Sequence, residues 1–112
     1  MSIASGNVFE GTGKFRERDF SIRIKINSVD GPNFKTQNEI WKGNFEQKVD
    51  VSEGFGTFID MGNGKVQMNW QDNNTKFEGI YNIANSTMTG RFFQYQEPLL
   101  GQGANFVLTL KA

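Results

Sequence analysis

The sequence contains no cysteine and no histidine among its 112 residues. Without cysteine, the chain cannot form disulfides, thiolate nucleophiles or cysteine-ligated metal sites. Without histidine, it lacks the commonest protein metal ligand and the side chain best suited to proton transfer near neutral pH. Ser–His and Cys–His catalysis and histidine-ligated zinc, iron or haem are therefore excluded. We accordingly predict that the protein is not an enzyme and that it uses no metal and no cofactor.

Charge of neither sign is in excess, because twelve basic residues balance twelve acidic ones and the sequence pI is about 6.2. The Lys and Arg residues are scattered rather than clustered, which argues against nucleic acid or an anionic membrane as a partner. No apolar run approaches the length of a membrane span, and the first residues carry no signal-peptide pattern. We therefore expect a cytoplasmic protein, although a secreted protein whose signal peptide had been removed would also lack this pattern.

The residues that are abundant favour strands and turns. The chain has 13 Gly and 11 Phe but only 2 Pro, and it contains no segment of useful length with the 3.6-residue period of a helix. Its length suffices for one domain with a single hydrophobic core, so we predict one all-β domain over residues 1–112.

Residues Lys76–Gln94 hold the clearest pattern in the chain, two copies of an apolar–x–Gly–x–apolar unit. When the two halves fold antiparallel around Ala84-Asn85, the glycines and large residues of both copies share one face, since side chains alternate with a period of two. The facing pairs are then Gly79 with Gly90, Phe77 with Phe92, and Tyr81 with Met88. A glycine inside a strand marks a bend or a close backbone approach, so the pattern predicts a coiled or closed antiparallel sheet.

Alternation of apolar and polar residues predicts six further strands. They cover Val8–Glu17, Phe20–Ser28, Ile40–Val51, Phe55–Met61, Val66–Gln71 and Phe106–Leu110, with Phe15 opposite Phe20 in the first hairpin. Long loops are predicted at Val29–Asn38 and Glu97–Ala104, and a short hairpin loop at Ser52-Glu53-Gly54. Eight strands joined mainly by tight turns predict an antiparallel up-and-down meander that closes into a small coiled β-barrel, with a β-sandwich as the alternative.

This run of short alternating strands resembles the avidin and lipocalin group of ligand-holding barrels and is calycin-like in its general plan. The Gly-x-Trp sequence that often marks lipocalins near the start is absent, and the chain has no room for their flanking helix. The resemblance implies a barrel that holds a small ligand, and we carry no functional residue over from it.

An apolar cavity inside the barrel is the first functional hypothesis. The aromatic residues expected to point inward are Phe9, Phe15, Phe20, Trp41, Phe45, Phe55, Trp70, Phe77, Tyr81, Phe92 and Phe106. These rings either leave room for a small, largely apolar ligand or fill a narrow eight-stranded barrel completely. The inward polar side chains would orient such a ligand or bond one another. The predicted ligand-binding residues are Trp41, Phe45, Gln47, Thr57, Trp70, Tyr81, Phe92 and Gln94.

A lectin-like module that binds a glycan is the second hypothesis. Side chains able to hydrogen-bond sugar hydroxyls gather in the sequence around Trp70, which could supply an aromatic surface beneath a sugar ring. They are Asn63, Asn69, Gln71, Asp72, Asn73 and Asn74. Asparagine is also a natural residue of tight turns, which explains most of them without any function.

A structural or protein-interaction domain without a small ligand is the third hypothesis. The alternation places several apolar residues on the outer face, namely Phe58, Ile80, Phe93, Tyr95 and Val107. Adjacent exposed apolar residues favour a protein contact, most simply a homodimer through Ile80, Phe93, Tyr95 and Val107. Analytical ultracentrifugation that found only monomer at high concentration would reject this dimer.

Overall fold

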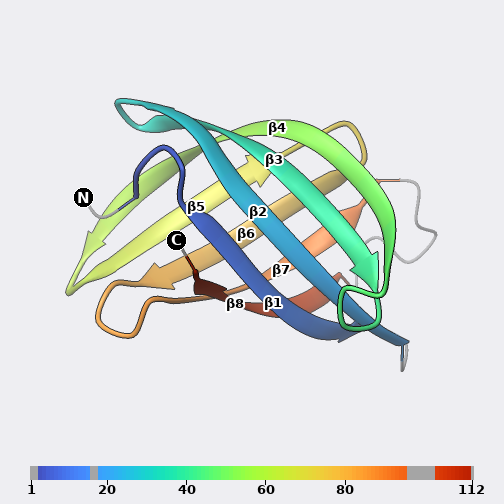
Figure 1. Cartoon of the computed structure of the whole chain (residues 1–112). Coiled ribbons are helices and arrows are strands. Elements are labelled where there is room, and N and C mark those ends of the chain that lie inside the picture. The colour runs from blue at the N-terminus through green and yellow to red at the C-terminus, as the bar shows by residue number, and fades with distance from the viewer. Residues whose placement is uncertain (1–2, 16–17, 96–102, 112) are drawn as a thin grey trace.

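The computed structural model describes residues 3–15, 18–95 and 103–111, which form eight antiparallel strands. The strands are β1 (Val8–Phe15), β2 (Arg18–Asp30), β3 (Asn33–Lys42), β4 (Gln47–Gly62), β5 (Lys65–Gln71), β6 (Thr75–Asn82), β7 (Thr87–Gln94) and β8 (Ala104–Leu110). Each strand pairs with the next, and β8 pairs with β1, so the sheet is a closed barrel (Figure 1). The all-β meander barrel predicted from the sequence is confirmed, and the β-sandwich alternative is not found.

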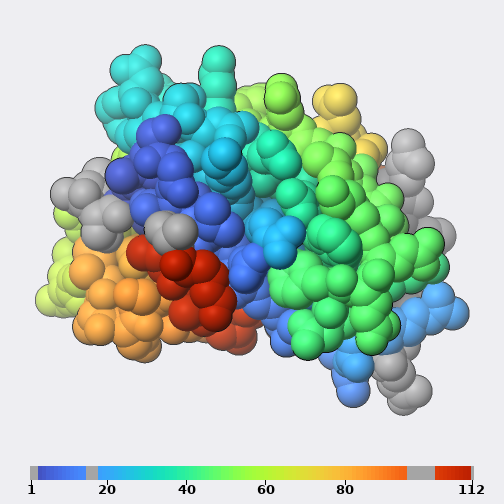
Figure 2. Space-filling model, viewed as in Figure 1, coloured from blue at the N-terminus to red at the C-terminus, as the bar shows by residue number. Residues whose placement is uncertain are grey.

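The first and last strands pair where the barrel closes. Phe9 of β1 pairs with Leu110 of β8, and Lys14 pairs with Asn105 at the other end of the same ladder. Figure 2 shows the blue atoms of the first strand lying directly against the red atoms of the last. Closure gives every strand a hydrogen-bonded neighbour on both sides, although residues 47–54 of β4 pair with β3 alone because the ladder with β5 begins at Phe55.

Side chains from all eight strands fill the interior of the barrel. One buried hydrophobic cluster includes Phe9, Phe20, Ile22, Ile24, Ile26, Phe34, Phe58, Val66, Met68, Trp70, Phe77, Tyr81, Met88, Phe92, Phe106 and Leu108. The rings pack in the arrangements that aromatic side chains prefer. Trp70 is stacked on Phe77 with ring centroids 5.0 Å apart, and Phe34 is stacked on Phe58 at 5.4 Å. The narrow interior is therefore occupied by the chain's own side chains.

Glycines let neighbouring strands approach more closely than any other residue would allow. A Cβ atom at Gly11, Gly56 or Gly90 would collide with a backbone carbonyl oxygen of the adjacent strand, belonging to Val107, Asn69 and Glu78 respectively. These close approaches lie at three seams of the barrel, between β1 and β8, β4 and β5, and β6 and β7. Close approach of this kind is compatible with the coiling that closes the eight strands into a barrel.

The hairpin β6–β7 has the register predicted from its repeated pattern. Gly79 pairs with Gly90, and Phe77 pairs with Phe92. In the first hairpin the register differs by two residues from the prediction, because Phe15 pairs with Arg18 and Phe20 pairs with Gly13. The Phe20 ring lies over the space left by Gly13. The shift preserves the alternation, so Phe20 still points inward.

The predicted loop at Val29–Asn38 is wrong, since β2 runs to Asp30 and β3 begins at Asn33. Only Gly31, with φ of 59°, and Pro32 form the turn. The true break comes later, where the predicted strand Ile40–Val51 is interrupted by a turn over residues 43–46. Gly43 and Phe45 both have positive φ there, 62° and 55°. The predicted loop Glu97–Ala104 lies mostly outside the described residues.

Strand β4 has its two faces exchanged relative to the prediction. The expected hairpin loop Ser52-Glu53-Gly54 lies inside this continuous strand. Phe55, Ile59 and Met61, predicted inward, are exposed, whereas Phe58, predicted outward, is buried. Gly54 and Gly56 lie on the inner face with Phe58 and press against the backbone of β5, where no larger residue fits. Packing at this seam, rather than hydrophobicity, sets the face of β4.

Replacing a glycine with alanine should destabilise the fold to a degree that depends on which atoms the added methyl group meets. Gly90→Ala places Cβ against the Glu78 carbonyl, which cannot move without opening the ladder, whereas Gly79→Ala meets the flexible end of Met88, with Sδ at 2.8 Å. We expect Gly79→Ala to lower the free energy of unfolding by about 1–3 kcal/mol and Gly90→Ala to lower it by more or prevent folding. Urea denaturation measures both, with exposed Thr89→Ala as the control. Equal effects of the two glycine substitutions would contradict the seam model.

Candidate functional site

Three of the eight predicted ligand-binding residues point into the barrel as expected. Trp70, Tyr81 and Phe92 are buried, with exposed fractions of 2%, 1% and 7%. Each belongs to the central hydrophobic cluster, and the Phe9 ring packs edge-on against Tyr81 at 5.4 Å. Their position is therefore predicted correctly, and they act as packing residues of the core. Their role in binding a ligand stays a prediction.

The other five predicted site residues do not join them. Gln47 and Thr57 are exposed, and Gln94 is half-buried at the pair with Thr75. Trp41 and Phe45 lie together at 5.7 Å over the guanidinium of Arg23. The prediction that all eight converge inside the barrel is wrong: Phe45 lies in the turn after β3, and β4 presents its odd-numbered residues, Gln47 and Thr57 among them, outward.

Arg23 anchors the turn at residues 43–46 to the sheet. It forms ion pairs with Glu10 of β1 and, through Nη1 at 3.1 Å, with Glu39 of β3. The indole Nε1 of Trp41 donates to the same Glu39 carboxylate at 3.0 Å. The hydrogen bond with Glu10, together with the negative charges of Glu10 and Glu39, holds the pKa of Arg23 above its ordinary value. These groups satisfy one another, so we assign the cluster a structural role.

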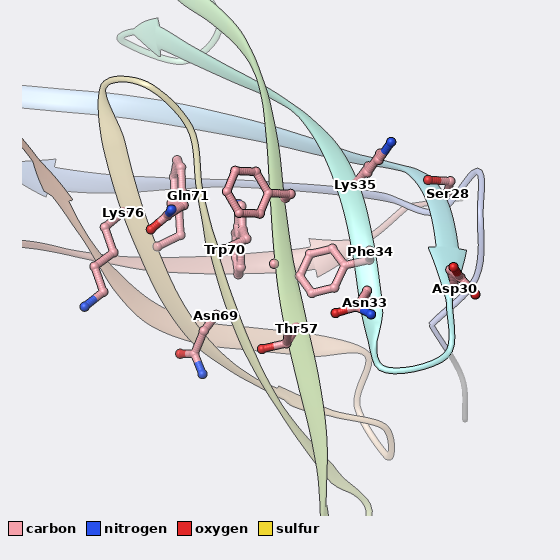
Figure 3. A pocket seen from close by; sticks show the side chains of 13 residues that line it. Ser28, Asp30, Asn33, Phe34, Lys35, Thr57, Asn69, Trp70, Gln71 and Lys76 are labelled. Atoms are coloured by element: carbon pink, nitrogen blue, oxygen red, sulfur yellow. The ribbon is translucent and has the colours of Figure 1, made fainter.

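An open pocket of about 640 Å³ lies across five strands, β2 to β6 (Figure 3). The strand register explains how its lining comes together, since cross-strand neighbours form two adjacent rows. The first row is Ser28, Lys35, Phe55, Gln71 and Lys76. The second row is Asp30, Asn33, Thr57 and Asn69. Buried Phe34, Trp70 and Phe77 also contribute to the lining.

Phe55 stands at the centre of this pocket, which we call the Phe55 pocket. It belongs to β4, the middle strand of the five, and its side chain is 60% exposed. Among the described residues the ring makes no aromatic contact and no cation–π contact. An unpartnered aromatic ring held on a rigid strand offers a flat apolar surface to a ligand. The sequence analysis placed Phe55 inside the barrel. The glycines at positions 54 and 56 could have indicated the opposite, because a close backbone approach at these positions puts them on the inner face and Phe55 on the outer face.

Several polar side chains around Phe55 have no hydrogen-bond or ion-pair partner. Within the described part of the chain, the side chains of Lys35, Thr57, Asn69 and Lys76 form no hydrogen bond or ion pair. Gln71 accepts one long hydrogen bond at 3.4 Å from the Tyr95 hydroxyl. The pocket therefore combines one apolar surface with donors and acceptors that are free to bond a ligand.

A second group of polar residues is buried beside this pocket. The Asn38 side-chain amide donates a hydrogen bond to Asp72 at 2.9 Å and accepts one from the Trp70 indole at 3.2 Å. These two bonds join β3 to the end of β5 and pass beside Gly54 of β4. Asp72 also accepts hydrogen bonds at 2.8 Å from the backbone N–H groups of residues 74 and 75. The hydroxyls of Thr36 and Thr75 are buried without a partner. Sequence alternation did not identify this cluster.

The sugar site expected around Trp70 is not assembled as predicted. Trp70 is buried and its indole bonds Asn38, so its ring cannot lie beneath a sugar. Asp72 is buried, and Asn63 lies in the turn between β4 and β5, far along β5 from residues 72–74. Of the six polar residues predicted around Trp70, Asn69 and Gln71 line the Phe55 pocket. Their side chains share the outer face of β5, opposite to Trp70.

The outer apolar residues are exposed as expected at Ile80, Tyr95 and Val107, while Phe93 is half-buried beneath the Arg91 guanidinium at 5.3 Å. Ile80 and Val107 lie in one cross-strand row through Thr89. Phe93 belongs to another row, opposite Lys76. The homodimer through these residues stays a prediction.

No protein-family model matches the chain, and no curated protein matches it significantly. Within residues 3–15, 18–95 and 103–111, no group of three or more acidic residues is placed to hold a metal ion. In the same residues, no helix is long and apolar enough to cross a membrane. The functional assignment therefore rests on the chemistry of the Phe55 pocket.

The two unpartnered hydroxyls allow a direct test of the buried cluster. Thr36→Val and Thr75→Val keep the side-chain shape and remove a desolvated hydroxyl, so each should raise the free energy of unfolding, by about 1–3 kcal/mol. Urea denaturation measures the change, and exposed Thr57→Val, expected to shift stability by less than about 0.5 kcal/mol, is the control. A loss of stability in the buried variants would reveal a bound water or ligand at these hydroxyls.

Proposed function

We propose that the protein is a non-catalytic binding module that holds a carbohydrate in the Phe55 pocket. The observation that carries the proposal is the exposed, unpartnered Phe55 ring surrounded by amide, hydroxyl and ammonium groups. The apolar C–H face of a sugar ring would pack on the phenyl ring. Its hydroxyls, which donate and accept, would bond the polar side chains around it.

The chemistry of the lining favours a sugar over a purely apolar ligand. Asn33, Asn69, Gln71 and Thr57 each both donate and accept hydrogen bonds, as do sugar hydroxyls. An apolar molecule would cover these groups without replacing the water bonds that they lose, which costs free energy at each group. A ligand with one apolar face and a polar edge avoids that cost.

The absence of histidine and cysteine from the sequence supports a role in binding rather than catalysis. The alternative of an apolar ligand inside the barrel would require buried rings such as Trp70 and Phe77, now stacked at 5.0 Å, to move apart. Close-packed interiors resist such changes, since separating packed rings forfeits their contacts. We therefore place the proposed ligand on the outer side of β4.

Comparing the sugar affinity of the Phe55→Ala and Ile59→Ala variants tests whether a sugar ring packs on Phe55. Both residues lie on the outer face of β4 with similar exposure, 60% and 57%, but only Phe55 lines the pocket. We expect Phe55→Ala to weaken sugar binding at least tenfold, about 1.4 kcal/mol, because the stacking surface is lost. Ile59→Ala should leave binding unchanged. A glycan array identifies the sugar, and titration calorimetry measures both variants.

Both substitutions remove exposed side chains, so thermal unfolding should show little change in either variant. If Phe55→Ala binds as tightly as the parent, the Phe55 pocket is not the site. If binding is instead lost in Tyr81→Phe, which removes one buried hydroxyl and keeps the ring, the ligand lies inside the barrel. A complete absence of binding on the array would reject the carbohydrate proposal.

A further inference from the structure

The Phe55 pocket is long in one direction. Its first row of cross-strand neighbours runs from Ser28 on β2 to Lys76 on β6, with Phe55 on the third of the five strands. Neighbouring strands are about 4.8 Å apart, so this row measures about 19 Å along the sheet. A single sugar ring packed on Phe55 would leave both ends of the pocket empty.

Hydrogen-bonding side chains lie on both sides of the central ring. Figure 3 shows Lys35 and Asn33 on one side of β4, and Asn69 and Gln71 on the other. All four side chains line the same pocket. A site that recognises the end of a chain needs a wall beyond its last sugar. Here the outermost lining residues, such as Ser28 and Lys76, are themselves exposed.

From this geometry we propose that the ligand is an internal segment of a linear saccharide chain that crosses the strands over Phe55. The inference rests on the proposed carbohydrate-binding function and adds the length and placement of the ligand. One sugar packs on the Phe55 ring, the preceding sugar bonds groups of β3, and the following sugar bonds groups of β5. Contacts on both sides add to the affinity, because the rigid sheet already holds them in place.

A series of probes of increasing length tests the proposal. Cello-, laminari-, xylo-, manno- and chito-oligosaccharides of one to six sugars are titrated by calorimetry, together with a soluble polysaccharide of the linkage that binds. We expect affinity to rise at least tenfold from the monosaccharide to the trisaccharide and then to level off. The polysaccharide should bind, per site, as tightly as the longest oligosaccharide, because it presents many internal segments and few ends.

Variants on each side of the ring locate the flanking contacts. Asn33→Ala on β3 and Asn69→Ala on β5 should each weaken trisaccharide binding severalfold, and by a clearly larger factor than they weaken monosaccharide binding. Gln67→Ala, on the outer face of β5 but outside the pocket, is the control. Asn33 is exposed and Asn69 is half-buried, so both variants are expected to fold normally. Thermal unfolding checks this.

The possible failures separate this inference from the function on which it rests. If a monosaccharide binds as tightly as any longer probe and Phe55→Ala abolishes that binding, the carbohydrate function stands and the chain inference is overturned. If oligosaccharides bind but the polysaccharide does not, the site recognises a chain end, which also overturns the inference. If no probe binds, the proposed function fails and the inference fails with it.

Discussion

The fold depends on the close approach of backbones at the inward glycines. At Gly90 a single Cβ atom would lie 2.0 Å from the Glu78 carbonyl oxygen, and Gly11 and Gly56 show the same constraint at the other two seams. Glycines inside the strands let the sheet coil, which allows the eight strands to close into a barrel. The same approach leaves little volume inside, and the chain's own aromatic rings occupy it.

A filled interior moves the candidate site to the outside of the barrel. At the seam between β4 and β5 the glycines take the inner face, so Phe55 points outward among the polar side chains of its neighbouring strands. The exposed ring and the exchanged faces of β4 therefore have one cause. The proposed saccharide site follows from the requirement for closure as well as from the residue types that surround the ring.

The sequence predicted the fold better than the site, for a physical reason. In β6 and β7 the large residues and the glycines share one face, so alternation alone gives the register of Phe77 and Phe92. In β4 apolar residues occupy both faces, and the choice between Phe55 and Phe58 depends on contact with the backbone of β5. That contact is tertiary, and no pattern within the strand contains it. Trp70 was correctly placed inside, but its burial leaves its ring without an exposed face on which a sugar could pack.

The central claim is that the barrel interior is solid and that ligands bind on the outer face at Phe55. Nuclear magnetic resonance titration of the labelled protein with a binding trisaccharide tests it most directly. The account predicts that the backbone amide signals of Phe55, Thr57 and Asn69 shift, while the methyl signals of the fully buried Met68, Met88 and Leu108 stay in place. Shifts concentrated in those interior methyl groups, with the Phe55 pocket unaffected, would contradict the account.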